Sequence, residues 1–234
     1  MPAYFTSKTP MKFVDFNYDA YFNYLEKTFG RLSFFSNWKR FWIDIFRYQD
    51  QQIIEFINKY PGSNPAIERM KRPGVPVGFS YEIFTYEFST AGGSIYLTFD
   101  VEKMKYVQHH KNVTIPIEEI PIEDIDVDPT TPIVRDKFKD QRLPFLTIMY
   151  GNNKPFICVD GNKRIQYRKE NSKIEKVKGY LFNENHWEYM FFLDYDQYYM
   201  WFTREQQYMY YLQKINSTEQ EIFEATQMYL QTND

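Results

Sequence analysis

The sequence predicts an α+β protein in which a mixed region of strands and helices, residues 75–183, is flanked by helical segments at residues 1–74 and 184–234. Two observations carry this prediction. Apolar residues recur at intervals of three and four near both ends, whereas the middle holds short runs rich in β-branched and aromatic residues. A chain of 234 residues is long enough for one large or two small domains.

The N-terminal segment is expected to contain two helices. Asp15 or Asn17 is a suitable N-cap for the first, and Gly30 is suited to end it. The second begins near Trp38 and runs to about Tyr60, where a Pro-Gly pair follows. Its buried stripe comprises Trp38, Phe41, Trp42, Ile45 and Phe46.

The mixed region is expected to open with a β-hairpin. The runs Val75–Phe88 and Ser94–Phe99 flank a turn-like segment, Ser89–Gly93. Residues 113–183 then alternate short strands with one clear helix. The tail returns to helix, and Ser217–Gln220 has the spacing of a capping box before the last one.

Composition excludes several classes of protein. The 28 Lys and Arg against 31 Asp and Glu give a net charge of −3, which excludes a chain that is basic throughout. The single cysteine, Cys158, excludes an internal disulfide and a zinc ribbon. With no secretory signal and no run of roughly 18 apolar residues, we expect a cytoplasmic protein without a membrane partner. Few alanines and many Lys, Asn, Tyr, Phe and Ile suggest a low-GC bacterium, phage or mobile element.

One segment has the features of a ligand-binding site. Two apolar strands, Phe145–Tyr150 and Pro155–Val159, are followed by Asp160–Arg164 and then by a helix. The surrounding residues 151–180 carry a local charge of +5, while the tail from residue 184 carries −7. The first amides of a helix lack intrahelical partners and carry partial positive charge, so this strand-to-helix turn suits an anion.

Lys163 and Arg164 stand at the positive end of that helix, where a cation is disfavoured by about 0.3 to 1 kcal/mol. A bound phosphate would offset this cost, because arginine offers a bidentate fork and Gly161 lets the backbone approach closely. The alternative is that Asp160 or Asn162 is an ordinary N-cap and both cations are solvated.

Residues 113–183 resemble the ParB/sulfiredoxin-like superfamily domain, whose strand-to-helix turn has a similar signature. The segments that carry the resemblance are Ile115–Ile120, Asp128–Pro132 with Arg135 and Phe138, Leu143–Ile148, Phe156–Arg164 and Lys176–Leu181. The resemblance implies a pocket for a nucleoside triphosphate, with Mg²⁺ as an accompanying ion. The residues it assigns to the nucleotide are Gly161, Asn162, Lys163, Arg164 and, from the proline-rich turn, Arg135. Asp160 is the candidate catalytic residue, as a helix cap or a ligand for water or metal.

Two departures from the family favour binding over catalysis. Sulfiredoxins carry a reactive cysteine at the position of Asn162, and Cys158 lies within the preceding strand instead. Nucleotide-hydrolysing ParB proteins carry a glutamate at that same position. Sulfinic acid reduction is therefore not expected, and slow nucleotide hydrolysis or phosphoryl transfer is a weaker expectation than binding.

No metal site is expected at the three histidines, because His109 and His110 are adjacent and His186 is remote from them. A run of carboxylates reads mostly as a solvated face, with one member as a candidate Mg²⁺ ligand. The run consists of Glu118, Glu119, Glu123, Asp124, Asp126 and Asp128.

The tail is rich in aromatic residues: 12 of the 25 residues from Trp187 to Tyr211. Base stacking requires neighbouring cations, and this tail is acidic, so we expect core packing or a protein interface, including a homodimer. Two alternatives stay open. The basic segment could contact DNA phosphates, or the protein could be a non-catalytic interaction module that retains the fold.

Overall fold

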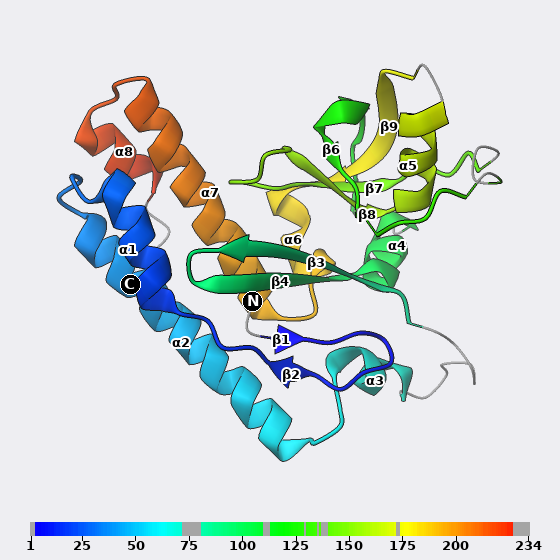
Figure 1. Ribbon diagram of the computed structural model, residues 1–234, viewed down its shortest axis with the longest axis horizontal. Helices are drawn as coiled ribbons and strands as arrows, with labels where there is room; N and C mark the ends of the chain where they lie inside the picture. The colour runs from blue at the N-terminus through cyan, green and yellow to red at the C-terminus, as the bar shows by residue number, and fades with distance from the viewer. Residues whose placement is uncertain are drawn as a thin grey trace. The chain divides into compact units, whose positions relative to one another are not determined.

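The computed structural model describes residues 3–71, 81–109, 113–128, 130–134, 136, 140–171 and 174–226. Helices and strands are mixed along these residues, which confirms the α+β class (Figure 1). The chain divides into two compact units. The first comprises Met1–Tyr81, Glu87–Thr98 and Phe192–Asp234, and the second comprises Glu82–Tyr86 and Phe99–Phe191.

The first unit is mainly helical. Its elements are β1 (Ala3–Tyr4), β2 (Lys12–Phe13), α1 (Tyr18–Phe29), α2 (Phe35–Lys59), α3 (Pro65–Met70), α7 (Asp194–Lys214) and α8 (Glu219–Ala225). The predicted ends of α1 are confirmed: the side chain of Asn17 accepts a hydrogen bond from the Ala20 amide, and Gly30 is the C-cap. Helix α2 begins at Phe35, one turn earlier than predicted.

Aromatic side chains from the tail help to form the core of this unit. Tyr195 of α7 stacks on Phe46 of α2 with ring centroids 5.3 Å apart, and Phe202 stacks on Trp38 at 5.2 Å. Tyr199 is also buried. The prediction of core packing is therefore confirmed for these side chains. Other aromatic residues of the same helix are exposed, namely Tyr208, Tyr210 and Tyr211.

The last described helix has a capping box, one residue later than predicted. Thr218 is the N-cap: its amide donates to the Glu221 carboxylate, and its hydroxyl oxygen accepts from the Glu221 amide. The predicted box, Ser217–Gln220, is wrong in register. Threonine and glutamate form the same motif as serine and glutamine, so the sequence allows both registers.

The predicted hairpin is formed by β3 (Ile83–Thr90) and β4 (Gly93–Asp100). Its connection is the two-residue turn Ala91–Gly92, which is tighter than the predicted Ser89–Gly93. The hydroxyl of Thr90 accepts from the Gly92 amide and donates to the Gly93 carbonyl, which closes the turn. The start of the predicted first strand, residues 75–80, lies outside the described residues.

The second unit contains a five-stranded mixed sheet. Besides its part of the hairpin, its elements are α4 (Val101–His109), β5 (Ile117–Pro121), the 3₁₀ turn η1 (Ile122–Asp124), β6 (Ile125–Asp126), β7 (Phe145–Ile148), β8 (Phe156–Asp160), α5 (Asn162–Asn171), β9 (Lys176–Phe182), the 3₁₀ turn η3 (Glu184–His186) and α6 (Trp187–Met190). The alternation of short strands with one clear helix predicted for residues 113–183 is confirmed within the described residues.

The strand order is β5-β9-β7-β8-β6. Strands β7 and β8 form the predicted antiparallel pair, with Leu146 opposite Cys158, and β9 runs parallel to β7. Ile165 of α5 is buried in one cluster with side chains of this sheet, including Leu146 and Cys158. This packing fixes the first turn of α5 at the end of β8.

The division into segments 1–74, 75–183 and 184–234 follows composition along the chain and stays a prediction. Contacts instead group the two chain ends in one unit. Within the described ranges, every helix is too short or too polar to span a membrane.

Candidate functional site: the turn between β8 and α5

Glycine is required at the turn between β8 and α5 for two reasons. Gly161 has φ of +104°, a conformation that residues with a Cβ rarely adopt. A Cβ at this position would also lie 2.7 Å from Nη2 of Arg164 and 2.9 Å from Cβ of Pro144. Gly161 therefore makes room for the guanidinium of Arg164. The sequence alone does not distinguish this role from the other one expected of the glycine, which is to let a phosphate approach the backbone.

Arg164 is buried, with 4% of its surface exposed. Its Nη1 lies 3.4 Å from Oδ2 of Asp140, and its Nη2 lies 3.4 Å from Oδ2 of Asp160. Its Nε has no hydrogen-bond partner among the described residues. Both contacts are longer than the 2.7–2.9 Å usual for charged N–H···O bonds, so these carboxylates engage the guanidinium only weakly.

Asp140 is held more firmly by Arg142. The Arg142 side chain donates to both Asp140 oxygens, at 3.0 and 2.8 Å, and its amide donates to Oδ1 at 3.1 Å. These hydrogen bonds from Arg142, together with the nearby charge of Arg164, hold the pKa of Asp140 well below its usual range. The carboxylate of Asp140 is therefore ionised at any pH near neutrality.

The side chain of Asn162 connects the loop at Asp128 to strand β8. Its Oδ1 accepts from the Asp128 amide at 3.1 Å, and its Nδ2 donates to the Cys158 carbonyl at 2.9 Å. Neither predicted capping side chain accepts a hydrogen bond from the first amides of α5, because Asp160 pairs with Arg164 and Asn162 is itself the first helical residue. The expectation of an N-cap at Asp160 or Asn162 is wrong: Gly161 occupies that place, and its carbonyl accepts from the Arg164 and Ile165 amides.

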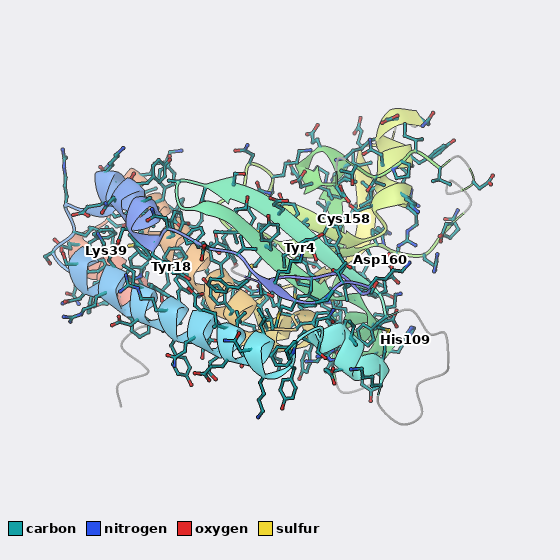
Figure 2. The ribbon with its side chains drawn as sticks, turned by 60° about the horizontal axis from the view of Figure 1, so that its bottom comes forward. Tyr4, Tyr18, Lys39, His109, Cys158 and Asp160 are labelled. Carbon is teal, nitrogen blue, oxygen red and sulfur yellow. The ribbon has the colours of Figure 1, made fainter. Side chains whose placement is uncertain are left out.

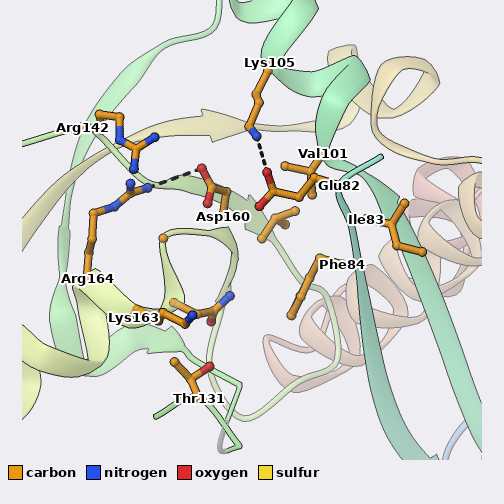
Figure 3. Close-up of a pocket in the computed structure, with 13 residues that line it drawn as sticks. Glu82, Ile83, Phe84, Val101, Lys105, Thr131, Arg142, Asp160, Lys163 and Arg164 are labelled. Carbon is orange, nitrogen blue, oxygen red and sulfur yellow. Dashed lines mark hydrogen bonds and ion pairs between the residues drawn. The ribbon is translucent and has the colours of Figure 1, made fainter. Parts of the chain in front are cut away.

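A cavity of about 350 Å³ lies over this turn, lined entirely by residues of the second unit (Figure 3). One part of the lining is apolar, with Ile83, Phe84, Val101 and Val159. The polar part has four cations, Lys105, Arg142, Lys163 and Arg164, and two carboxylates, Glu82 and Asp160. The lining is therefore cationic on balance.

The four cations differ in whether a carboxylate already pairs with them. Lys105 pairs with Glu82, as Figure 3 shows, and with Glu102 at 3.2 Å. Arg142 is exposed and bound to Asp140. Lys163 is exposed, and neither a carboxylate nor a hydrogen-bond acceptor pairs with it within the described part of the chain. Of the four, Lys163 has the charge most open to a ligand.

Five candidate residues from the sequence line this cavity: Asp160, Gly161, Asn162, Lys163 and Arg164. Arg135 lies outside the described residues. Sequence reasoning missed Glu82, Lys105, Asp140 and Arg142, which reach the cavity or its arginine from other parts of the chain. No local motif marks these four residues.

The remaining candidates have structural roles. Cys158, two residues before Asp160 (Figure 2), is fully buried, and burial raises the pKa of its thiol, so it is an inert core residue. Nδ1 of the buried His186 accepts from the Asn183 amide, so its Nε2 donates to the Thr114 carbonyl.

No cluster of three potential metal ligands occurs among the residues described. Glu118 and Glu119 are exposed on β5, as a solvated face requires.

Several side chains of the basic segment turn inward. Besides Arg164, Lys154 and Lys169 both donate to the carbonyl of Ile125. The +5 charge of residues 151–180 is therefore not presented as one continuous face.

The fold and the turn together define an α+β protein with a cationic pocket at a strand-to-helix junction. Comparison of the chain with protein-family models, curated proteins and solved structures finds no match.

Proposed function

We propose that the cavity over Gly161 binds a nucleotide through its phosphates. The observation that carries the proposal is the position of this cavity, which combines the start of a ten-residue helix with a cationic wall and an apolar wall. Its volume of about 350 Å³ is near the lower end for small-molecule sites. Phosphates would bind at the polar wall, and the base would contact Phe84, Ile83 and Val101.

Lys163 is the principal phosphate ligand in this proposal. The amides of Asn162 and Lys163 have no hydrogen-bond acceptor among the residues described, as is usual in the first turn of a helix. An anion placed there would accept hydrogen bonds from these amides and from the Lys163 ammonium. Its negative charge would also interact favourably with the positive end of the helix dipole.

Arg164 contributes in a different way from that implied by the family resemblance. Its long contacts to Asp140 and Asp160 leave its charge only partly compensated. A phosphate oxygen in the cavity would add a partner to this guanidinium without leaving a carboxylate unpaired, because Arg142 retains Asp140. Arg135 is included among the proposed phosphate ligands only because the family resemblance assigns it to the nucleotide.

Asp160 fits the place of a Mg²⁺ ligand. Protein Mg²⁺ sites commonly use one or two carboxylates together with substrate phosphates and water. Asp160 lines the cavity and is only partly buried. When bound, the ion would neutralise phosphate charge, and Asp160 would hold it beside the Lys163 side of the pocket.

Hydrolysis has less support than binding. The side-chain amide of Asn162 is occupied by the Asp128 backbone amide and the Cys158 carbonyl, so it does not replace the water-orienting glutamate of ParB-type proteins. A role in DNA binding has less support too, because Lys154, Lys169 and Arg164 point toward protein acceptors.

Replacing Lys163 by alanine is expected to weaken nucleotide binding at least tenfold, because a charge-assisted hydrogen bond contributes about 1.5–3 kcal/mol. The measurement is the thermal stabilisation of the full chain by ATP, CTP, GTP or UTP, each with Mg²⁺. Because Lys163 is exposed and a cation is disfavoured at this end of the helix, the ligand-free melting temperature should not fall.

The matched control is Lys178→Ala on β9, another exposed lysine that does not line the cavity. This variant should bind as the wild type does. Stabilisation of the wild type by none of the four nucleotides, or equal stabilisation of Lys163→Ala, would refute nucleotide binding at this turn. A phosphate-release assay on the same samples then separates binding from turnover.

A further inference from the structure

Two lysines of the second unit meet at one backbone oxygen. The ammonium nitrogen of Lys169, on α5, lies 2.6 Å from the carbonyl oxygen of Ile125, and that of Lys154, before β8, lies 3.4 Å from the same atom. The two nitrogens are consequently no more than about 6 Å apart, within the range at which like charges perturb each other. Neither lysine lines the cavity over Gly161.

Nearby negative charge does not neutralise the positive charges of these two lysines. Asp126 is the carboxylate whose charge acts on Lys169, and its Oδ2 already accepts from the Tyr86 hydroxyl at 2.6 Å and from the Asn152 side-chain amide at 3.5 Å. In the part of the chain described, neither Lys154 nor Lys169 forms an ion pair with a carboxylate. Two half-buried ammonium groups therefore share one neutral acceptor.

The arrangement favours the neutral form of Lys169. Burial is the main cause, and the charge of Lys154 acts in the same direction, whereas Asp126 and the Cys158 thiol oppose both; together they lower the pKa of Lys169 to about 8. As a neutral amine, Lys169 still donates one N–H to the Ile125 carbonyl and keeps a lone pair on its nitrogen. A neutral, partly exposed amine beside a cation is the usual arrangement of a nucleophilic lysine.

We propose that Lys169 is a carbonyl-reactive amine and that Lys154 binds the anionic group of the same compound, a small aldehyde or ketone bearing a carboxylate or phosphate. The lone pair of the Lys169 nitrogen attacks the carbonyl carbon and forms the C–N bond. The carbonyl oxygen then leaves as water with the two protons of the amine, which gives an imine. No oxidant or reductant is needed. Lys154, as the remaining ammonium, pairs with the carboxylate or phosphate.

The test is reductive trapping on the full-length chain. The protein is incubated with glyoxylate and cyanoborohydride at about pH 7.5, and modification of each lysine is followed by peptide mass spectrometry. We expect Lys169 to be modified about tenfold faster than the exposed Lys178, because a larger fraction of its amine is neutral. A rate for Lys169 equal to or below that of Lys178 would overturn the proposal.

Variants of Lys154 test the pairing. Lys154→Met should slow trapping at Lys169 several-fold and abolish the preference for glyoxylate over uncharged acetaldehyde. Lys154→Arg keeps the charge and should retain both properties, so it also controls for a general effect on folding. If Lys154→Met and wild type react alike, or if acetaldehyde reacts as fast as glyoxylate, Lys154 does not anchor the ligand and the proposal fails.

Discussion

Replacing Gly161 by alanine is expected to destabilise the second unit by about 3 kcal/mol, from backbone strain together with steric overlap. The strain arises because φ at this position is +104°. The overlap arises because the new methyl group would lie 2.7 Å from Arg164 Nη2 and 2.9 Å from Pro144 Cβ. Relief requires the guanidinium to move away from its carboxylates, although it is buried and has no other described partner for its Nε.

Gly151→Ala is the matched control for this experiment. Gly151 also has positive φ, +76°, in the turn between β7 and β8, but a Cβ there would meet no atom within 4 Å. Only the backbone term applies, so the expected loss is about 1 kcal/mol. Urea denaturation followed by hydrogen exchange of peptides from residues 145–182 measures both variants in the same unit. Equal losses for the two variants would show that Arg164 does not occupy the space beside Gly161.

The strand-to-helix turn is predictable from sequence because its parts are contiguous. The apolar run before Asp160, the glycine and the following helix all act over a few residues, as do the caps of α1 at Asn17 and Gly30. For α8 the same local reasoning predicts a capping box but not its register, because an adjacent serine and threonine allow two registers and the structure has the one at Thr218.

The environment of Arg164 is not predictable in that way. Local electrostatics indicate that two cations at a helix start need negative charge nearby, and a bound phosphate is one source. The structure supplies Asp160 from the turn and Asp140 from 24 residues earlier, in a segment without a recognisable motif. Long-range placement of this kind depends on the order of strands in the sheet, which composition and periodicity do not fix.

The grouping of the two chain ends in one unit also depends on long-range packing that the sequence does not reveal. The aromatic tail packs on the N-terminal helices because residues such as Tyr195 and Phe202 complete an apolar core begun by Phe46 and Trp38. Helical periodicity identifies the side chains that need burial, but it does not identify the surface that buries them.

Asp196 is expected to make the first unit less stable as the pH rises. Its side chain is 1% exposed near the start of α7, and Oδ2 accepts only a long hydrogen bond, 3.4 Å, from the Thr98 amide. Burial raises the pKa of Asp196 to about 7. Since the ordinary value is near 4, the folded state retains a proton that the unfolded state releases between those two values. Stability therefore falls as the pH rises from about 4 to about 7, and this group causes no further change above that range.

Asp196→Asn removes this dependence, because the amide oxygen still accepts from Thr98 and carries no charge. The variant should match the wild type near pH 4 and exceed it at pH 8, by at most about 4 kcal/mol. The measurement is urea denaturation across this pH range, followed by tryptophan fluorescence, to which the buried Trp38 and Trp42 of the first unit contribute. Burial also raises the pKa of Asp50, to about 6, so in Asp196→Asn the fall of stability with pH should be smaller than in the wild type but not absent.

Asp194→Asn separates burial from the simple loss of a negative charge. Asp194 lies in the same first turn of α7 but is exposed, so its replacement removes the same charge from the helix start without relieving any desolvation. Loss of a favourable helix-dipole interaction should make this variant slightly less stable than the wild type at pH 8, by about 0.5 kcal/mol. A gain of the same size for Asp194→Asn would show that loss of negative charge, and not relief of desolvation, stabilises Asp196→Asn. A pH-independent gain for Asp196→Asn would show that the Asp196 carboxylate is solvated in the folded protein.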